Sequence, residues 1–170
     1  IDLDLKFKNP FKISKKNSSK FVISSLNLAH KLALNKGVAG IINCPINKNL
    51  LNRKKIGVTE FLAAKCRIKK NTEVMLIKGR KNAVSPLTTH IDISQVTKKI
   101  KKKLITNKVK TINKYYKILF KKKPRIGVLG LNPHNSENRN DSIEKKIILP
   151  TILYLKKKKF NCLGPLVSDT

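Results

Sequence analysis

Apolar positions recur at helical spacing in three stretches of the chain. Residues 18–35 carry apolar side chains every three or four positions, between a pair of serines and Gly37, which predicts an amphipathic helix. Residues 92–120 form a long basic stretch with helical spacing, for which we predict a break near Thr106 and Asn107. A third helix is predicted over residues 142–157. Shorter helical turns are expected at residues 46–52 and 60–65.

Short continuous apolar runs separate these helices. Residues 38–42 (VAGII) and 125–131 (RIGVLGL) are typical of strands buried in a parallel sheet. Further strands are predicted at residues 74–77, 83–88 and 160–166. Alternation of strands and helices predicts an α/β fold with a mostly parallel sheet. Since no repeat or linker divides the chain, we expect residues 1–170 to have no internal domain boundary.

The composition adds a strong positive charge. The 170 residues include 39 Lys and Arg against 9 Asp and Glu, a formal net charge of +30. Such a charge favours phosphate backbones, but lysine is spread along the whole chain and arginine, the usual residue for bidentate contacts, is scarce. A solvated surface set by composition is therefore favoured, and no specific nucleic-acid partner is expected. A non-enzymatic basic protein that binds nucleic acid stays open as an alternative.

Two other features of the composition bear on location. No apolar run approaches the roughly 20 residues that span a bilayer, so no membrane partner is expected. The three cysteines are widely spaced and form no CxxC pair, which indicates reduced thiols. Both features predict a cytoplasmic protein.

Two histidines follow predicted strands. His90 comes after the run 83–88 and His134 after the run 125–131. Ligands of α/β proteins gather at the carboxyl ends of strands, and imidazole is a common metal ligand and proton carrier. Single strand-end histidines are also often ordinary hydrogen-bonded surface residues, so the spacing alone leaves both explanations open. His30, inside the first predicted helix, is interpreted as structural.

Five segments carry a resemblance to a known family. They look like the motifs PINK, GHTEFLA, TTH, GLNPHAGE and GPLPADT of the 4-hydroxythreonine-4-phosphate dehydrogenase family, in the same order and at comparable intervals. The similarity runs from about residue 24 to residue 170. In this chain the segments are CPINKNLL (44–51), GVTEFLA (57–63), LTTHIDI (87–93), GLNPHNSE (130–137) and GPLVSDT (164–170).

The resemblance implies a fold and an activity. The fold is a layered α/β/α subunit similar to isocitrate and isopropylmalate dehydrogenases, paired in a homodimer whose active sites are shared between subunits. The activity is the NAD-dependent oxidation, with decarboxylation, of 4-phosphooxy-L-threonine, a phosphorylated small molecule on the route to pyridoxal phosphate. A divalent metal (Zn, Mg or Co) bound to the substrate's hydroxyl lowers its pKa and favours hydride departure.

The resemblance also assigns residues. His90 and His134 match two of the family's three metal histidines, and Thr59 matches its substrate-binding threonine. Val58 occupies the position of the family's substrate-binding histidine, and Val has no hydrogen-bonding side chain. Lys48 offers positive charge to a phosphate or carboxylate. No catalytic residue or NAD contact is assigned within the chain.

Two departures from the family shape the expectation. The chain has neither the glycine-rich GDPAGIGPE-like opening of family members nor their later HDQG segment, which supplies the third metal histidine. We therefore interpret residues 1–170 as a central fragment, incomplete at both ends and inactive alone. Val58 also keeps open a dehydrogenase of a four-carbon sugar-acid phosphate, such as threonate or erythronate 4-phosphate. Val58, the residues 138–141 in place of the family's glycines and the missing ends together keep open an inactive descendant.

Overall fold

The computed structural model describes residues 1–51, 57–68, 72–89 and 91–168. The chain divides into two compact units, Ile1–Lys70 and Asn71–Thr170, each of which is described by itself. No helix in the described ranges has both the length and the apolar character needed to cross a bilayer.

The first unit is built on helix α1 (Lys15–Ala33), close to the predicted bounds. Ser14 caps its N-terminus by accepting a hydrogen bond from the backbone N–H of Asn17 at 3.2 Å. The Ser19 hydroxyl donates to the backbone carbonyl of Leu50 at 2.5 Å. This bond fastens the 3₁₀ turn η2 (Lys48–Leu50) to α1. The unit also contains the turn η1 (Pro10–Lys12) and helix α2 (Val58–Lys65).

One strand prediction in this unit is wrong. Residues 38–42 form no strand, and Val38 and Ile42 are exposed rather than buried. A strand is stable only when its backbone groups bond to a neighbouring strand, and within the described residues none pairs with this segment. The apolar run alone cannot supply that neighbour.

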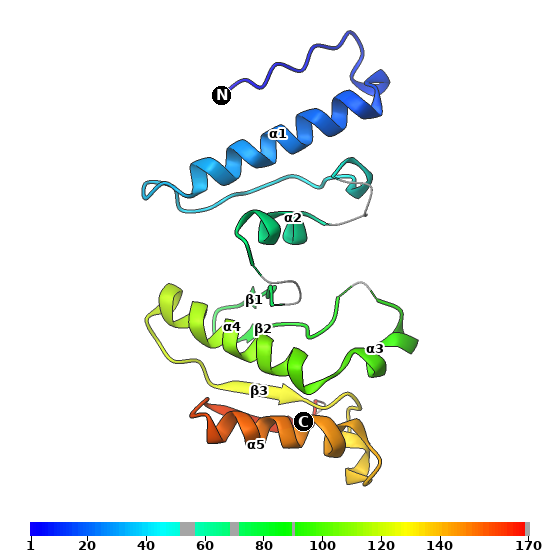
Figure 1. The fold of residues 1–170 in the computed structure, drawn as a ribbon, viewed down its shortest axis with the longest axis vertical. Helices are drawn as coiled ribbons and strands as arrows, with labels where there is room; N and C mark the ends of the chain where they lie inside the picture. The colour runs from blue at the N-terminus through cyan, green and yellow to red at the C-terminus, as the bar shows by residue number, and fades with distance from the viewer. Residues whose placement is uncertain (52–56, 69–71, 90, 169–170) are drawn as a thin grey trace. The chain divides into compact units, whose positions relative to one another are not determined.

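The second unit holds the α/β layer (Figure 1). Strand β3 (Ile126–Leu129) pairs in parallel with β4 (Cys162–Leu166), and helix α5 (Leu149–Lys157) connects them. This strand–helix–strand unit confirms the predicted α/β class. Helices α3 (Ile93–Lys99) and α4 (Lys102–Phe120) precede it, and β1 (Ile77–Lys78) and β2 (Ala83–Val84) form a short antiparallel hairpin.

The core of this unit lies where α4, α5 and β4 meet. Burial of one aliphatic side chain in this core contributes about 1.5–3 kcal/mol to the free energy of folding. Thr151 is also fully buried, and its hydroxyl donates to the carbonyl of Ile147 at 2.6 Å, so its polar group is satisfied within the helix. The buried apolar members are Ile100, Ile105, Val109, Ile148, Ile152, Leu155 and Cys162.

The third predicted helix begins with a π-helical turn, η4 (Glu144–Ile148), that runs directly into α5. Pro150 stands in the first turn of α5. Because proline has no backbone N–H, it cannot continue a regular i→i−4 ladder at that point. Single π turns of this kind are frequent at functional sites.

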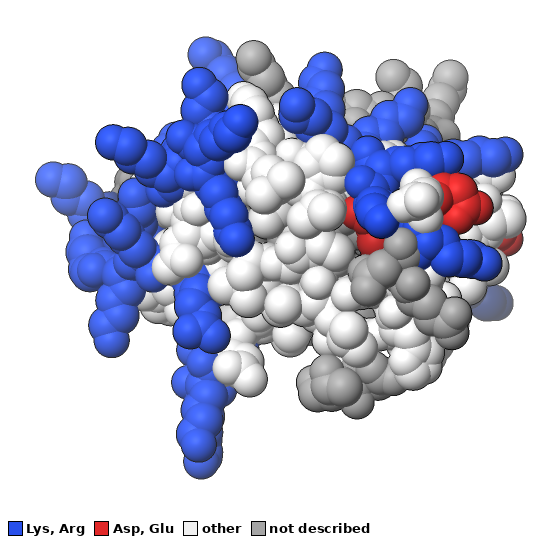
Figure 2. Space-filling model, turned by 90° about the horizontal axis from the view of Figure 1, so that it is seen from below, with Lys and Arg blue, Asp and Glu red and all other residues white. Residues whose placement is uncertain are grey.

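The positive charge lies at the surface. Figure 2 shows lysine and arginine side chains projecting around a largely uncharged middle of the face drawn there. Some lysines also cover aromatic rings, as Lys102 does with its ammonium group 4.5 Å from the ring centre of Tyr154.

Candidate functional site

The loop after β3 carries the GLNPH motif. Gly130 opens it, at a position where a Cβ atom would lie 2.0 Å from Oδ1 of Asn135 and 3.0 Å from the backbone oxygen of Asn132. The side-chain oxygen of Asn132 accepts the backbone N–H of His134 at 2.9 Å. The loop therefore folds back on itself over Gly130, which leaves room for glycine alone.

A buried carboxylate anchors this loop. Glu144, in the π turn, is only 3% exposed. Its Oε1 accepts the backbone N–H groups of Leu131 at 2.8 Å and Asn132 at 2.9 Å, and its Oε2 accepts the Ser136 hydroxyl at 3.1 Å. Burial alone raises the pKa of Glu144, but the hydrogen bonds from Asn132, Ser136 and Leu131 outweigh it and hold the pKa below its ordinary value.

These hydrogen bonds offset strain in the loop. Asn135 and Ser136 have φ values of +52° and +50°, a left-handed conformation that costs most residues about 1–2 kcal/mol each. Ser136 stands where the motif GLNPHAGE has glycine. Of the three bonds to Glu144, the one from the Ser136 hydroxyl holds a residue of this turn directly, and a hydrogen bond to a charged group contributes about 1.5–3 kcal/mol.

The loop after β3 is joined to the segment GPLVSDT at β4. The backbone N–H of Gly130 donates to the carbonyl of Leu166 at 3.0 Å, and that of Ser168 donates to the carbonyl of Pro133 at 3.2 Å. Gly164 makes the close approach possible, since it has φ +128° and a Cβ atom there would lie 2.3 Å from the carbonyl oxygen of Val128. The structure thus brings together two motifs that are about 30 residues apart in sequence.

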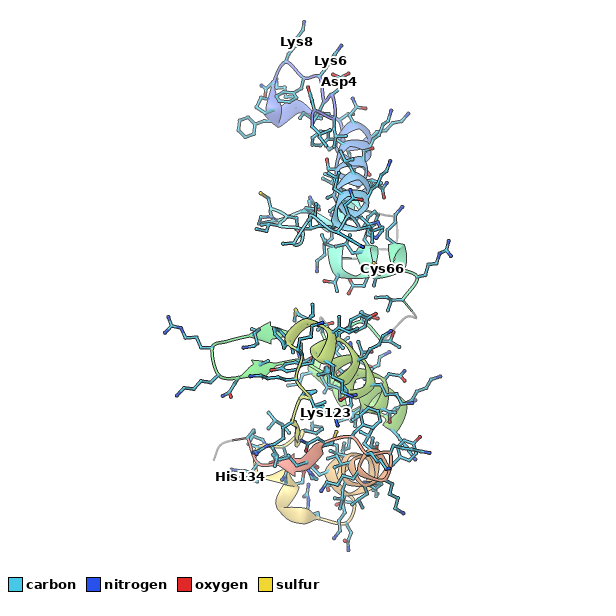
Figure 3. The ribbon with its side chains drawn as sticks, turned by 90° about the vertical axis from the view of Figure 1, so that its left-hand side faces the viewer. Asp4, Lys6, Lys8, Cys66, Lys123 and His134 are labelled. Atoms are coloured by element: carbon cyan, nitrogen blue, oxygen red, sulfur yellow. The ribbon has the colours of Figure 1, made fainter. Side chains whose placement is uncertain are left out.

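His134 lies exposed on this loop, beyond the end of β3 (Figure 3). This is the strand-end position that the sequence predicts. An exposed imidazole on an anchored loop fits a divalent metal, because imidazole nitrogen is a good ligand for such ions. Within the described residues, no three His, Cys, Asp or Glu side chains gather in a metal-binding cluster.

His90 lies outside the described residues, so its predicted pairing with His134 stays a prediction. The segment that follows it is described. Asp92 caps α3 by accepting the backbone N–H of Ser94 at 2.8 Å. Hydrogen bonds from the Ser94 hydroxyl and backbone lower the pKa of Asp92. The TTHID motif therefore leads directly into the start of a helix.

The predicted substrate residues belong to the first unit. Thr59 is exposed in the first turn of α2, and Val58 beside it is half-buried. The carboxylate of Glu60 accepts the backbone N–H of Gly57 at 2.9 Å, which fixes the start of the helix. Lys48 is exposed at the start of η2. Their roles stay predictions, and their placement is described only within their own unit.

The sequence patterns did not single out Glu144. A signal was present, because Glu144 shares helical spacing with Ile148, Thr151 and Leu155, and all four are buried. An acidic residue in line with an apolar face indicates a buried carboxylate with fixed partners.

Comparisons with known proteins agree with the motifs. A family model described as "Pyridoxal phosphate biosynthetic protein PdxA" matches residues 1–170. The 4-hydroxythreonine-4-phosphate dehydrogenase of Sulfurihydrogenibium sp. is 35% identical over 174 residues, which cover 99% of this chain and 52% of that protein. The enzyme of the same name from Aquifex aeolicus is also 35% identical, over 99% of this chain and 53% of its own length. The chain spans about half the length of the curated relatives it matches.

Solved structures show the same likeness of fold. A 4-hydroxythreonine-4-phosphate dehydrogenase from Burkholderia phymatum has a TM-score of 0.74 at 29% identity, over 99% of this chain and 51% of that one. One from Klebsiella pneumoniae has a TM-score of 0.80 at 24% identity, over 97% of this chain and 52% of that one. The ordered motifs, the joined strand-end loops and the match over the whole length lead to one conclusion. This chain belongs to the PdxA family of pyridoxal phosphate biosynthetic proteins.

Proposed function

We propose that the protein containing this chain is an NAD-dependent, divalent-metal-assisted dehydrogenase that oxidises and decarboxylates 4-phosphooxy-L-threonine. The family membership and the names of the relatives support this activity. The structural observation that carries it is the joining of the GLNPH loop to the GPLVSDT segment, which fixes the loop that bears His134. The proposed setting is a cytoplasmic homodimer that shares its active sites between subunits.

The chain's own residues have distinct parts in this proposal. His134, with His90, holds the metal. Thr59 donates its hydroxyl to the substrate from the first turn of α2, at the end of the helix whose dipole favours an anion such as phosphate. Lys48 adds positive charge for the same anion. When bound, a divalent metal favours loss of the proton from the substrate's hydroxyl group, while NAD accepts the hydride.

Activity assays on the full-length protein test the proposal. We expect the parent protein to reduce NAD with 4-phosphooxy-L-threonine. We expect the activity of His90→Ala and of His134→Ala to fall by more than about 10- to 100-fold, the loss that follows removal of a residue that only supports a metal ligand. His30→Ala is the matched control, since His30 lies in α1 and contacts Cys66, at 3.5 Å. The proposal fails if both site variants keep the metal affinity and the NAD reduction of the parent.

Val58 favours a second candidate, a dehydrogenase of threonate or erythronate 4-phosphate. Valine removes a charge-assisted hydrogen bond worth about 1.5–3 kcal/mol, or about ten- to a hundredfold in affinity. If 4-phosphooxy-L-threonine is the substrate, Val58→His raises kcat/KM for it by up to that factor. If a sugar-acid phosphate is the substrate, the parent has the higher kcat/KM for that compound and the variant gains nothing.

A further inference from the structure

We infer that Glu144 is a positioning residue, whose carboxylate holds the loop 131–136 in the conformation that presents His134 to a divalent cation. The inference rests on the proposed function in one respect, the role of His134 as a metal ligand. Glu144 is 3% exposed and its hydrogen bonds go to the loop. It therefore acts through the loop rather than on the cation or the substrate.

The hydrogen bonds of Glu144 lie on both sides of His134. Oε1 accepts the backbone N–H groups of Leu131 and Asn132, and Oε2 accepts the hydroxyl of Ser136. Asn132 and Ser136 are each two residues from His134. One rigid, buried carboxylate thus fixes the backbone before and after the imidazole, and the side-chain direction follows from the backbone.

Packing does not explain the carboxylate at this position. Glu144 lies one helical turn before Ile148, and both are buried with Ile152 and Leu155. A carboxylate is costly to bury, whereas an aliphatic side chain at the same place is favourable. The three hydrogen bonds from the loop are what compensate this cost, so the loop accounts for the presence of the carboxylate.

The strain in the loop shows why an anchor is needed. Asn135 and Ser136 follow His134 directly and both have positive φ. Asparagine tolerates this conformation, and Asn135 is also held by its bond to Pro165, whereas serine returns to negative φ when nothing holds it. Release of Ser136 and of the backbone at Asn132 therefore allows the turn to relax, and relaxation directly after His134 changes the direction of its imidazole.

The test uses full-length protein in four variants: Glu144→Ala, Glu144→Gln, Thr151→Val and His134→Ala. Co²⁺ is the probe, with its affinity measured by titration of the visible absorption band. Hydrogen exchange of the Leu131 and Asn132 amides is measured without metal, together with thermal unfolding. Thr151→Val is the matched control, because Thr151 is buried in α5 and bonds only to the carbonyl of Ile147 in the described contacts.

We expect Glu144→Ala to speed exchange of both amides and to weaken Co²⁺ binding about 10- to 100-fold, the usual effect of losing a residue that orients a metal ligand. Glu144→Gln keeps one acceptor oxygen and falls between the parent and Glu144→Ala, which provides a reading if the alanine variant does not fold. Thr151→Val lowers the melting temperature and leaves the Co²⁺ affinity unchanged.

Two results overturn the inference, and they can be told apart. If His134→Ala weakens Co²⁺ binding but neither Glu144 variant does, the positioning role is wrong and the proposed function stands. If His134→Ala leaves the affinity unchanged, His134 is no ligand, and both the proposed metal site and the positioning role are wrong.

Discussion

The side-chain amide of Asn135 donates a hydrogen bond to the backbone carbonyl of Pro165, with the two atoms 3.1 Å apart. The residues come from two motifs, GLNPHNSE, which begins where β3 ends, and GPLVSDT, which begins inside β4. A contact between a side chain of the loop after β3 and the backbone of β4 ties this loop to the neighbouring strand. Substitutions in either motif are therefore expected to affect both.

Asn135 is the first residue to substitute. Asn135→Gly loses one hydrogen bond, worth about 1 kcal/mol, but keeps the positive φ of +52° at little cost. Asn135→Ala loses the same bond and adds about 1–2 kcal/mol of backbone strain. We expect the alanine variant to be the less stable of the two in urea unfolding of the full-length protein. Equal stability of the two variants would contradict the left-handed conformation of residue 135.

Gly130 is expected to tolerate no side chain. In Gly130→Ala the new Cβ meets Asn135 Oδ1 and the backbone oxygen of Asn132, which cannot both move away. We expect a loss of about 1–3 kcal/mol in the free energy of unfolding. Gly37→Ala is the control, since a Cβ there has no atom within 4 Å. A Gly130→Ala variant as stable as the Gly37→Ala variant would refute the packing of this loop.

The lowered pKa of Glu144 predicts a loss of stability in acid. Because the pKa is lower in the folded than in the unfolded state, the stabilisation is complete above the unfolded value, about 4.3, and is lost as pH falls through the folded value. Urea unfolding of the full-length protein between pH 7 and pH 3 measures this loss. In Glu144→Gln the dependence is expected to be shallower, since glutamine does not titrate. Parallel curves for the two proteins would contradict this expectation.

The three thiols are expected to differ in reactivity. Cys44 and Cys66 are exposed, whereas Cys162 is buried in the core and burial raises its pKa, against a smaller lowering by Lys156. Since the thiolate is the reactive form, a disulfide reagent should modify Cys44 and Cys66 in the native protein. The number of fast-reacting thiols should fall by one in Cys44→Ser and in Cys66→Ser. It should not change in Cys162→Ser, and a fall in that variant would disprove the expectation that Cys162 is protected.

Lys121 ends α4 in a left-handed conformation, with φ +56°. Glycine is the residue that adopts this conformation at a helix end with least cost. Lys121→Gly is therefore expected to stabilise the protein by about 1 kcal/mol, read as a rise in the melting temperature. Lys122→Gly removes the same charge from a residue without positive φ, and is expected to give no such rise.

The sequence predicted the second unit well where local patterns carry the information. The run 125–131 and the helix before Pro124 correspond to β3 and α4, because a continuous apolar run and a proline stop are local signals. The break predicted near Thr106 is wrong, and the helices instead separate at Ile100 and Lys101. Thr106 is buried on the inner face of α4, where neighbours in space decide its conformation rather than its own polarity.

The candidate site was predictable in outline only. The strand-end position of His134 follows from the run before it, and the structure has it there. Two of the partners of Glu144 were not predictable, because Leu131 and Asn132 donate backbone N–H groups, which do not depend on the type of residue. Contacts of this kind depend on tertiary structure and become visible only in three dimensions.

The π turn at 144–148 has a consequence for how this segment tolerates change in length. A π turn contains one residue more than a regular turn, so it is equivalent to an insertion inside the helix. Deletion of Lys145 or Lys146 would restore regular helical geometry downstream and would look harmless in any measure of helix propensity. The wider turn absorbs its extra residue, so Glu144 keeps the phase of a regular helix relative to α5, and deletion of one of these lysines is expected to leave it facing the amides that it binds. Deletion of both lysines, in contrast, would rotate Glu144 by about 100° relative to α5, away from those amides. The irregular turn therefore gives the segment one residue to spare, and the coupling between the core face of α5 and the loop 131–136 is lost only with the second.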